Sequence, residues 1–313
     1  MNRTLGPRSV ENILSETFVI YRRNFLRLAA IVSIVAVPFA VVGFIVNLLF
    51  PAYSGGTTEA LSNTIISIPL GLAAFVAFIL MGGAVIHAVS EQYFNQPVNI
   101  GRAYSFAWHR MGDMFWALFL AGLAIWGIMV AATIISVIIA FAIGGSSEWQ
   151  VALAVAGMLI LIATPAAIYL GITWTFMLQT ALLEGCGPTA ALSHSSALVK
   201  RSWWRVLGIV LLFVIIVMTI NMILYIPVVI SAVPAFMTGP TTWATTGPPS
   251  WIIIAASIGA LIGNIICIPI FTIGETLLYF DLRVRKQGYD LNTLSSELGL
   301  TSAPTDTGAS LPG

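Results

Sequence analysis

Residues 187–213 read GPTAALSHSSALVKRSWWRVLGIVLLF, and this stretch decides how the chain is arranged. A short helix is predicted to begin at Pro188. Proline suits the first position of a helix, because the N–H that it lacks would have no hydrogen-bond partner there. It runs into the basic pair Lys200–Arg201, the indoles Trp203–Trp204 and Arg205, and a charge-free apolar run follows. Such residues mark a membrane–water interface. The stretch therefore predicts a surface helix, an anchor and a spanning helix, in that order.

The composition places the chain in a membrane. Hydrophobic residues make up 58% of the 313 residues and charged residues only 8%, whereas soluble domains are roughly 25% charged. The net charge is +1 and the thirteen Lys and Arg residues stand in small clusters, so no nucleic-acid partner is expected.

Six charge-poor runs are long enough to cross a bilayer, which takes about 20 helical residues. They cover 28–50, 65–89, 114–143, 151–178, 206–237 and 251–280. The three loops that follow the first, third and fifth runs (51–64, 144–150 and 238–250) contain no Lys or Arg, so all thirteen basic residues fall on one side. The positive-inside rule then predicts that the N- and C-termini are both cytoplasmic.

The pattern of the opening stretch occurs three times. Pro7, Pro97 and Pro188 each begin an amphipathic segment that leads into two apolar runs. We interpret the fold class as an all-α integral membrane protein with six transmembrane helices, built as three repeated units of interfacial amphipathic helix plus helical hairpin. The repeats cover about 7–96, 97–187 and 188–288, and an odd number of parallel repeats favours pseudo-threefold packing about the membrane normal.

The chain is predicted to form one domain over residues 1–300. A terminal amphipathic helix is expected over about 290–299, where Asp290 can cap a helix whose leucines share one face. Residues 301–313 (TSAPTDTGASLPG) are small and polar and are predicted to be a disordered tail.

Three segments carry a family resemblance: ILSETFVIYRRNFLRLAAIVSIVAVP, ALSHSSALVKRSWWRVLGIVLL and LLYFDLRVRKQGYDL. Together they resemble the prokaryotic multi-span family named after the glycerophosphoryl diester phosphodiesterase membrane domain, over about residues 9–299. The resemblance implies a multi-pass protein of the prokaryotic cytoplasmic (inner) membrane. The chain lacks the catalytic phosphodiesterase barrel and its metal-binding motifs, so the resemblance implies no phosphodiesterase activity.

Basic and aromatic residues at the membrane surface are the candidate lipid-binding groups. Each Lys or Arg near an anionic surface contributes about 1 kcal/mol to binding, although every polytopic protein needs such charges for its topology. The candidate headgroup anchors are Arg22, Arg23, Arg110, Lys200, Arg201, Trp203, Trp204, Arg205, Arg283 and Arg285.

Glu275 is the most informative polar residue, because an ionisable group inside a spanning run is a functional hypothesis by default. The alternative is that Glu275 lies near the cytoplasmic end and pairs with Arg283, Arg205 or His87. Three intramembrane asparagines, Asn47, Asn221 and Asn264, either bridge helices by hydrogen bonds or line a polar path.

No catalytic, cofactor or metal site is expected. The three histidines, His87, His109 and His194, form no H-x-x-x-H or H-x-x-E-H pair, and the two cysteines lack metal-site spacing. The serines around His194 have no nucleophile-elbow glycines, so they are more consistent with helix caps or headgroup contacts.

Two stripes of small residues favour close helix packing, within the bundle or between copies of the chain. They are Ala255, Gly259, Gly263 and Cys267 in the last run, and Ala163, Ala167, Gly171 and Thr175 in the fourth. From all of these features we expect a non-enzymatic membrane module that binds lipids or organises another membrane protein. The alternative is a transporter or lipid-moving protein with a polar path near Glu275 and Asn264.

Overall fold

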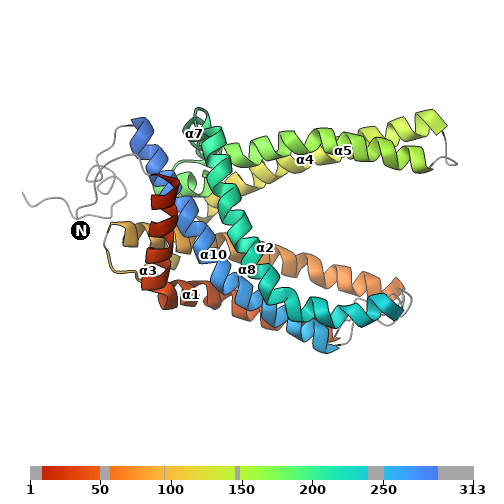
Figure 1. The fold of residues 1–313 in the computed structure, drawn as a ribbon, viewed down its shortest axis with the longest axis horizontal. Helices are drawn as coiled ribbons and strands as arrows, with labels where there is room; N and C mark the ends of the chain where they lie inside the picture. The colour runs from red at the N-terminus through yellow and green to blue at the C-terminus, as the bar shows by residue number, and fades with distance from the viewer. Residues whose placement is uncertain (1–8, 50–56, 95, 145–148, 239–249, 288–313) are drawn as a thin grey trace, which may run out of the picture.

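The computed structural model describes residues 9–49, 57–94, 96–144, 149–238 and 250–287, and the regular structure in these ranges is helical (Figure 1). Within these described ranges, six helices are long and apolar enough to cross a membrane, with windows of mean hydropathy between 2.1 and 2.9. The predicted all-α class with six spans is therefore confirmed, and the protein is a multi-pass membrane protein.

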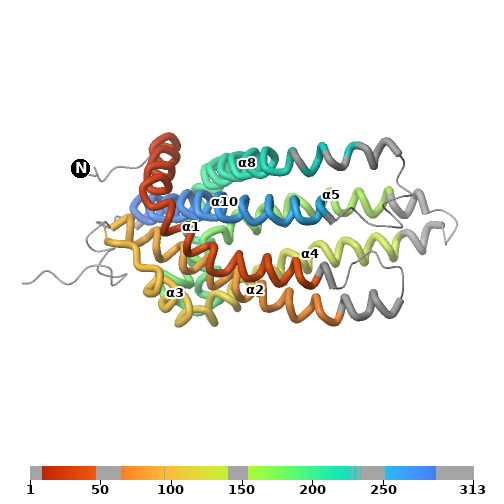
Figure 2. Tube along the Cα trace, turned by 90° about the horizontal axis from the view of Figure 1, so that it is seen from below, coloured from red at the N-terminus to blue at the C-terminus, as the bar shows by residue number. Residues whose placement is uncertain are grey.

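Helix α1 (Val10–Leu49) consists of a short first arm and a long spanning arm, joined at a kink. The backbone leaves helical geometry at Asn24 (φ −122°, ψ 17°), and the Asn24 side-chain amide donates to the Ile20 carbonyl at 3.2 Å. That bond supplies a partner to a carbonyl beside the break. The first arm lies crosswise to the long arm in both Figure 1 and Figure 2, as a surface helix would.

Helix α2 (Thr57–Tyr93) returns along α1, and a short connection leads to α3 (Ile100–His109). The Asn99 side chain caps α3 by accepting a hydrogen bond from the Arg102 amide at 3.1 Å. Helix α3 ends at Arg110, and α4 (Met111–Gly144) begins at the next residue. A surface helix and a spanning helix therefore meet directly at Arg110.

The fourth apolar run does not form one uninterrupted helix, although its candidate span extends to Glu184. Helix α5 (Trp149–Thr173) breaks before α6 (Met177–Gln179), and a π-helical turn, η2 (Thr180–Glu184), follows. The Ser195 hydroxyl donates to the Thr173 carbonyl at 2.9 Å and accepts from the Phe176 amide at 3.2 Å, so it satisfies backbone groups on both sides of the break. Ser195 therefore has the capping role considered for the serines around His194.

Helix α7 (Pro188–Val199) has Pro188 at its start, as predicted, and a short turn joins it to α8 (Trp203–Thr238). The last long helix is α10 (Ser250–Gln287), whose final turns extend past the apolar run and carry basic residues. At 38 residues, α10 is about 57 Å long. This length exceeds the roughly 30 Å hydrocarbon layer, so part of α10 lies outside it.

The three hairpins do not pack equivalently. Helix α1 packs on α2 and α10, and α10 packs on α8, whereas α4 packs mainly on α5. Figure 1 shows the α4–α5 hairpin diverging from the other four long helices and meeting them at one end, where α3 and α7 lie. The expectation of pseudo-threefold packing is therefore wrong for the described residues, because the first and third hairpins share a large contact that the second lacks.

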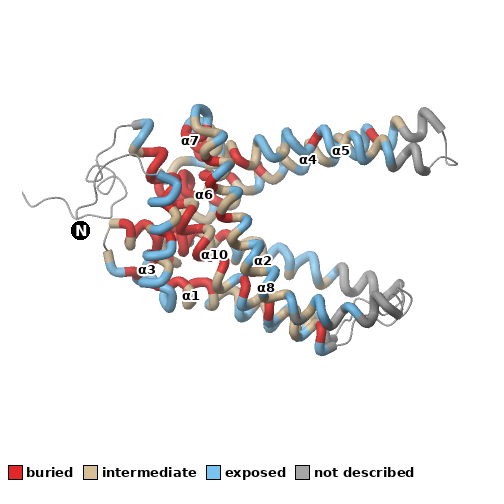
Figure 3. Tube along the Cα trace, in the orientation of Figure 1, coloured by how far each residue is buried: buried red, intermediate tan, exposed pale blue. Residues whose placement is uncertain are grey.

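The first arm of α1, helices α3, α6, η2 and α7 with the turns that follow α3 and α7, and the final turns of α10 form what we call the basic end. It carries Arg23, Arg110, Arg201 and Arg283. Buried residues concentrate there, whereas the hairpin arms are largely exposed (Figure 3). In the six spans, the most apolar windows have only 11–17% of their residues buried inside the protein. Lipid must therefore cover most of the apolar surface of the arms.

Two parts of the sequence prediction are not decided by this architecture. The three-repeat organisation stays a prediction, although a surface-lying segment precedes a spanning helix in α1, α3–α4 and α7–α8. The terminal helix at 290–299 and the tail at 301–313 lie outside the described residues.

Candidate functional site

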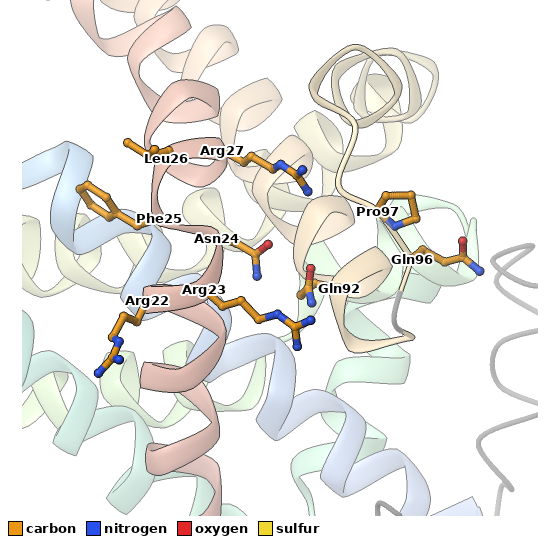
Figure 4. Close-up of a pocket in the computed structure, with 9 residues that line it drawn as sticks. All are labelled: Arg22, Arg23, Asn24, Phe25, Leu26, Arg27, Gln92, Gln96 and Pro97. Carbon is orange, nitrogen blue, oxygen red and sulfur yellow. The ribbon is translucent and has the colours of Figure 1, made fainter. Parts of the chain in front are cut away.

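A basic pocket of about 660 Å³ lies at the kink of α1, where the first arm meets the spanning arm. Arg23, Arg27 and Gln92 extend into the same space between α1 and α2, while Arg22 lies on the other side of α1 (Figure 4). Within the described residues, the three arginines make no hydrogen bond or ion pair. Their guanidinium groups are exposed and are available to an anion. We call this site the first hinge pocket; it is lined by Arg22, Arg23, Asn24, Phe25, Leu26, Arg27, Gln92, Gln96 and Pro97.

A second basic pocket, of about 870 Å³, lies where α7 turns into α8. Lys200 and Arg201 are exposed on its rim, and Trp204 extends from it with 79% of its surface exposed. Trp203 stacks on Tyr169 of α5 with ring centroids 5.7 Å apart, which holds one wall in place. We call this site the second hinge pocket; it is lined by Pro165, Tyr169, Thr173, Ser196, Lys200, Arg201, Ser202, Trp203, Trp204 and Arg205.

The arginine at the remaining hinge has a different role. Arg110, between α3 and α4, donates to the Gly185 carbonyl at 3.0 Å and is half-buried. Gly185 has a left-handed backbone (φ 63°), and a Cβ added there would lie 2.5–2.6 Å from the Arg110 guanidinium. Arg110 therefore fastens the loop after η2 and is not free for lipid.

Three other predicted anchors are held by carboxylates. Arg205 and Arg285 both donate to Asp281, at 3.0 and 2.9 Å. Arg283 is buried, and its guanidinium lies 3.8 Å from Glu184. These ion pairs tie α8 and η2 to the final turns of α10. Six of the ten predicted anchors therefore remain as candidates for lipid contact. They line the two hinge pockets and are Arg22, Arg23, Lys200, Arg201, Trp203 and Trp204.

Glu275 does not make the ion pair expected for it. Arg283 pairs with Glu184, Arg205 pairs with Asp281, and the His87 ring lies 4.0 Å from Glu91. Glu275 is half-buried, and the side chain beside its carboxyl group is the amide of Gln179. The pairing prediction is therefore wrong, since all three proposed partners are occupied by other acids.

Glu91, which sequence reasoning did not single out, is the acid that organises the α2–α3 connection. It is buried, it accepts from the Asn99 amide at 3.2 Å, and it lies 3.3 Å from Arg102. His87, one turn before it, contacts the Phe106 ring in a tilted arrangement with ring centroids 4.4 Å apart. The signal that could have identified Glu91 is the position of an acid at the end of a spanning run, eleven residues before a basic one.

The intramembrane asparagines do not converge. Asn221 of α8 donates to the Val217 carbonyl at 2.9 Å and to the Cys267 sulfur of α10 at 3.3 Å, so it bridges two helices. Asn264 instead lines an apolar groove of about 430 Å³ between α1, α2 and α10. Asn47 lies in α1, but its side chain is outside the described part of the chain.

The small-residue stripe of α10 faces α8, as the packing interpretation predicts. A Cβ added at Gly259 would lie 3.5 Å from the Leu224 carbonyl, and one at Gly263 would lie 2.6 Å from the Asn221 side chain. This face is therefore used within the bundle. In the stripe of α5, Gly171 has no atom near enough to meet an added Cβ, so self-association through α5 stays a prediction.

The loop after η2 brings three metal-ligating side chains together, although no metal site was expected from the sequence. The ligand atoms of Glu184, Cys186 and His194 all lie within 4.8 Å of one another. His194 Nδ1 lies 2.6 Å from Glu184 Oε2, and the Cys186 thiol faces the Thr180 carbonyl at 3.5 Å. Burial raises the pKa of the Cys186 thiol, and the nearby Glu184 carboxylate adds to the rise.

Paired-histidine motifs could not predict this cluster, because its three members are a glutamate, a cysteine and a histidine. The Glu184 carboxylate comes from η2, the Cys186 thiol from the following loop and the His194 imidazole from α7. His109, by contrast, is exposed and lies 2.7 Å from the Ser105 carbonyl, within its own helix.

No family model, no curated protein and no solved structure matches this chain, so the family resemblance of the sequence stays a prediction.

Proposed function

We propose that the protein is a non-enzymatic membrane module that binds anionic lipid headgroups at its basic end, in the cytoplasmic membrane of a prokaryote and with both termini in the cytoplasm. The observation that carries the proposal is the pair of hinge pockets. Each places unpaired basic side chains where a surface helix turns into a spanning helix, which is the depth of lipid phosphates.

The contrast between the hinges supports a binding role over a purely topological one. Topology requires only that positive charge lie on the cytoplasmic side, and a charge fastened to protein serves that purpose as well as a free one. Arg110 is fastened to Gly185, whereas Arg23 and Arg27 converge on an open pocket with Gln92 (Figure 4). Guanidinium and amide donors that converge on one space suit phosphate oxygens.

The expected preference follows from the number of free charges. Each basic side chain near an anionic surface contributes about 1 kcal/mol, so two arginines at one pocket favour an anionic over a zwitterionic lipid by about 30-fold. Removal of one charge should lower the preference about fivefold. Higher ionic strength should weaken it, because the pockets are open to solvent.

The proposal can be tested with the full chain in nanodiscs of zwitterionic lipid containing a minor fraction of phosphatidylglycerol, with retained lipids counted by native mass spectrometry. Arg23→Gln/Arg27→Gln and Lys200→Gln/Arg201→Gln should each lose retained anionic lipid. Lys286→Gln removes one charge that does not line either pocket, where the Lys286 ammonium donates to the Ala197 carbonyl, and should lower the count less than either double variant. Equal counts for all variants and the wild type would overturn the proposal.

A second candidate, a lipid-moving protein, is favoured by one observation. The groove between α1, α2 and α10 is apolar except for Asn264 and Ser257, and its volume of about 430 Å³ suits an acyl chain. Glu275 lies eleven residues further along α10, about 16 Å away, and does not line this groove. A labelled lipid in reconstituted vesicles would distinguish this candidate from a lipid-binding module. A lipid-moving protein should exchange the label between the two leaflets, and Asn264→Leu should slow this exchange.

A further inference from the structure

We propose that Glu184, Cys186 and His194 form a binding site for a divalent transition-metal ion of the zinc type, at the basic end and distinct from the two hinge pockets. Thiolate, imidazole and carboxylate are the three ligand types that zinc takes in proteins. Their ligand atoms lie within 4.8 Å of one another, from three successive pieces of chain.

The separations suit a tetrahedral ion after a small adjustment. Metal–ligand distances of 2.0–2.3 Å place two tetrahedral ligands about 3.3–3.8 Å apart. His194 Nδ1 and Glu184 Oε2 are closer than this, at 2.6 Å, because a proton joins them. An ion that displaces this proton to solvent would move the two atoms apart by roughly 0.7 Å, which a side-chain rotation of the half-exposed His194 can supply.

Neighbouring residues orient the Glu184 carboxylate as they do around established metal ligands. The Tyr279 hydroxyl donates to Oε1 at 2.8 Å, and the Arg283 guanidinium lies 3.8 Å from the same oxygen. The other oxygen, Oε2, is left facing His194. Hydrogen bonds of this kind fix the direction of a ligand and tune its affinity.

The loop between the ligands is also held in place. Gly185 separates Glu184 from Cys186, has a left-handed backbone and has its carbonyl bound by Arg110. The π-helical turn η2 ends at Glu184, and such turns occur frequently at functional sites. The two ligands on either side of Gly185 therefore project from a fixed turn.

The charge balance is favourable. The Glu184 carboxylate and the Cys186 thiolate supply two negative charges for one divalent cation, and the thiol proton passes to solvent when the ion binds. With three protein ligands, the fourth position of a tetrahedral ion is left to water. The proposed site therefore resembles open zinc sites more than closed structural ones.

The test is a cobalt(II) titration of the full chain in detergent micelles, after treatment with a chelator. A thiolate-to-cobalt absorption band should grow to one cobalt per chain, and zinc should displace it. Cys186→Ser should abolish the band. Cys267→Ser is the matched control and should leave it unchanged, because Cys267 is buried in α10 and binds Asn221.

The histidines offer a second matched pair. His194→Gln should weaken cobalt binding at least tenfold, whereas His109→Gln should have no effect, since His109 lies outside the cluster. Alkylation of the wild-type chain needs no variant: zinc should protect Cys186 from a thiol reagent. Absence of a band, a band that survives Cys186→Ser, or equal alkylation with and without zinc would each refute the site.

Discussion

Asp281 should be one of the most sensitive positions for the stability of the basic end. Its carboxylate, with only 2% of the side chain exposed, accepts from Arg205 of α8 at 3.0 Å and from Arg285 of its own helix at 2.9 Å. Asp281→Asn keeps the shape and removes the negative charge that the Arg205 and Arg285 guanidinium groups share. The substitution should therefore loosen the contact between α8 and the end of α10.

The magnitude follows from burial. Breaking a fully buried ion pair destabilises a protein by about 3–5 kcal/mol. The Arg205 and Arg285 side chains are 29% and 30% exposed, so water recovers part of their hydration. We therefore expect a loss of roughly 2–3 kcal/mol in the free energy of unfolding. At about 2–4 °C per kcal/mol, the apparent melting temperature should fall by about 4–12 °C.

The measurement is thermal unfolding of the purified chain in one detergent, followed by intrinsic fluorescence. Glu11→Gln is the control. It removes the same single negative charge, and Glu11 is exposed on the first arm of α1. The double variant Arg205→Gln/Asp281→Asn should be less destabilised than the sum of its single variants, since both act on one interaction. A shift for Asp281→Asn no larger than that for Glu11→Gln would show that the pair contributes nothing.

Two further changes test the loop after η2 and the docking of α3. Gly185→Ala should lower the free energy of unfolding by about 1–3 kcal/mol, because it forces a left-handed backbone on alanine and displaces the Arg110 guanidinium. The control is Gly112→Ala in the same melting assay. It should be neutral or stabilising, since there is open space around Gly112. Tyr104 donates to the Ile31 carbonyl at 2.5 Å and burial raises its pKa to about 12, so the folded state holds this proton more tightly than the unfolded chain. The resulting stability is complete below pH 10 and is lost as the pH rises toward 12, so the wild type should lose melting temperature over that interval more steeply than Tyr104→Phe; equal slopes would contradict the assignment.

The spans and hinges could be predicted from the sequence because their signals are local. A run of apolar residues and the proline, basic and aromatic residues before it lie within one short window, as at Pro188 and Trp203. The break of α5 after Thr173 left no such signal. It depends on Ser195, which satisfies the exposed backbone groups from 22 residues further along the chain.

The hydrogen bonds and ion pairs that join the helices of the basic end could not be predicted, because they connect residues far apart in sequence. Glu184 meets Tyr279 across 95 positions, and Arg205 meets Asp281 across 76. Glu275 attracted attention because its depth in the membrane is visible in the sequence, but which arginine faces which acid depends on the rotation of each helix about its axis.

The divergence of the α4–α5 hairpin decides what holds it in the bilayer. Along most of its length the hairpin packs mainly on itself and diverges from the other spans, so packing on those spans does not fix its tilt. It meets the rest of the protein at its base, where Arg110, one residue before α4 begins, donates to the Gly185 carbonyl. The orientation of the hairpin is therefore set at its base, and the Arg110–Gly185 hydrogen bond is one of the contacts that set it.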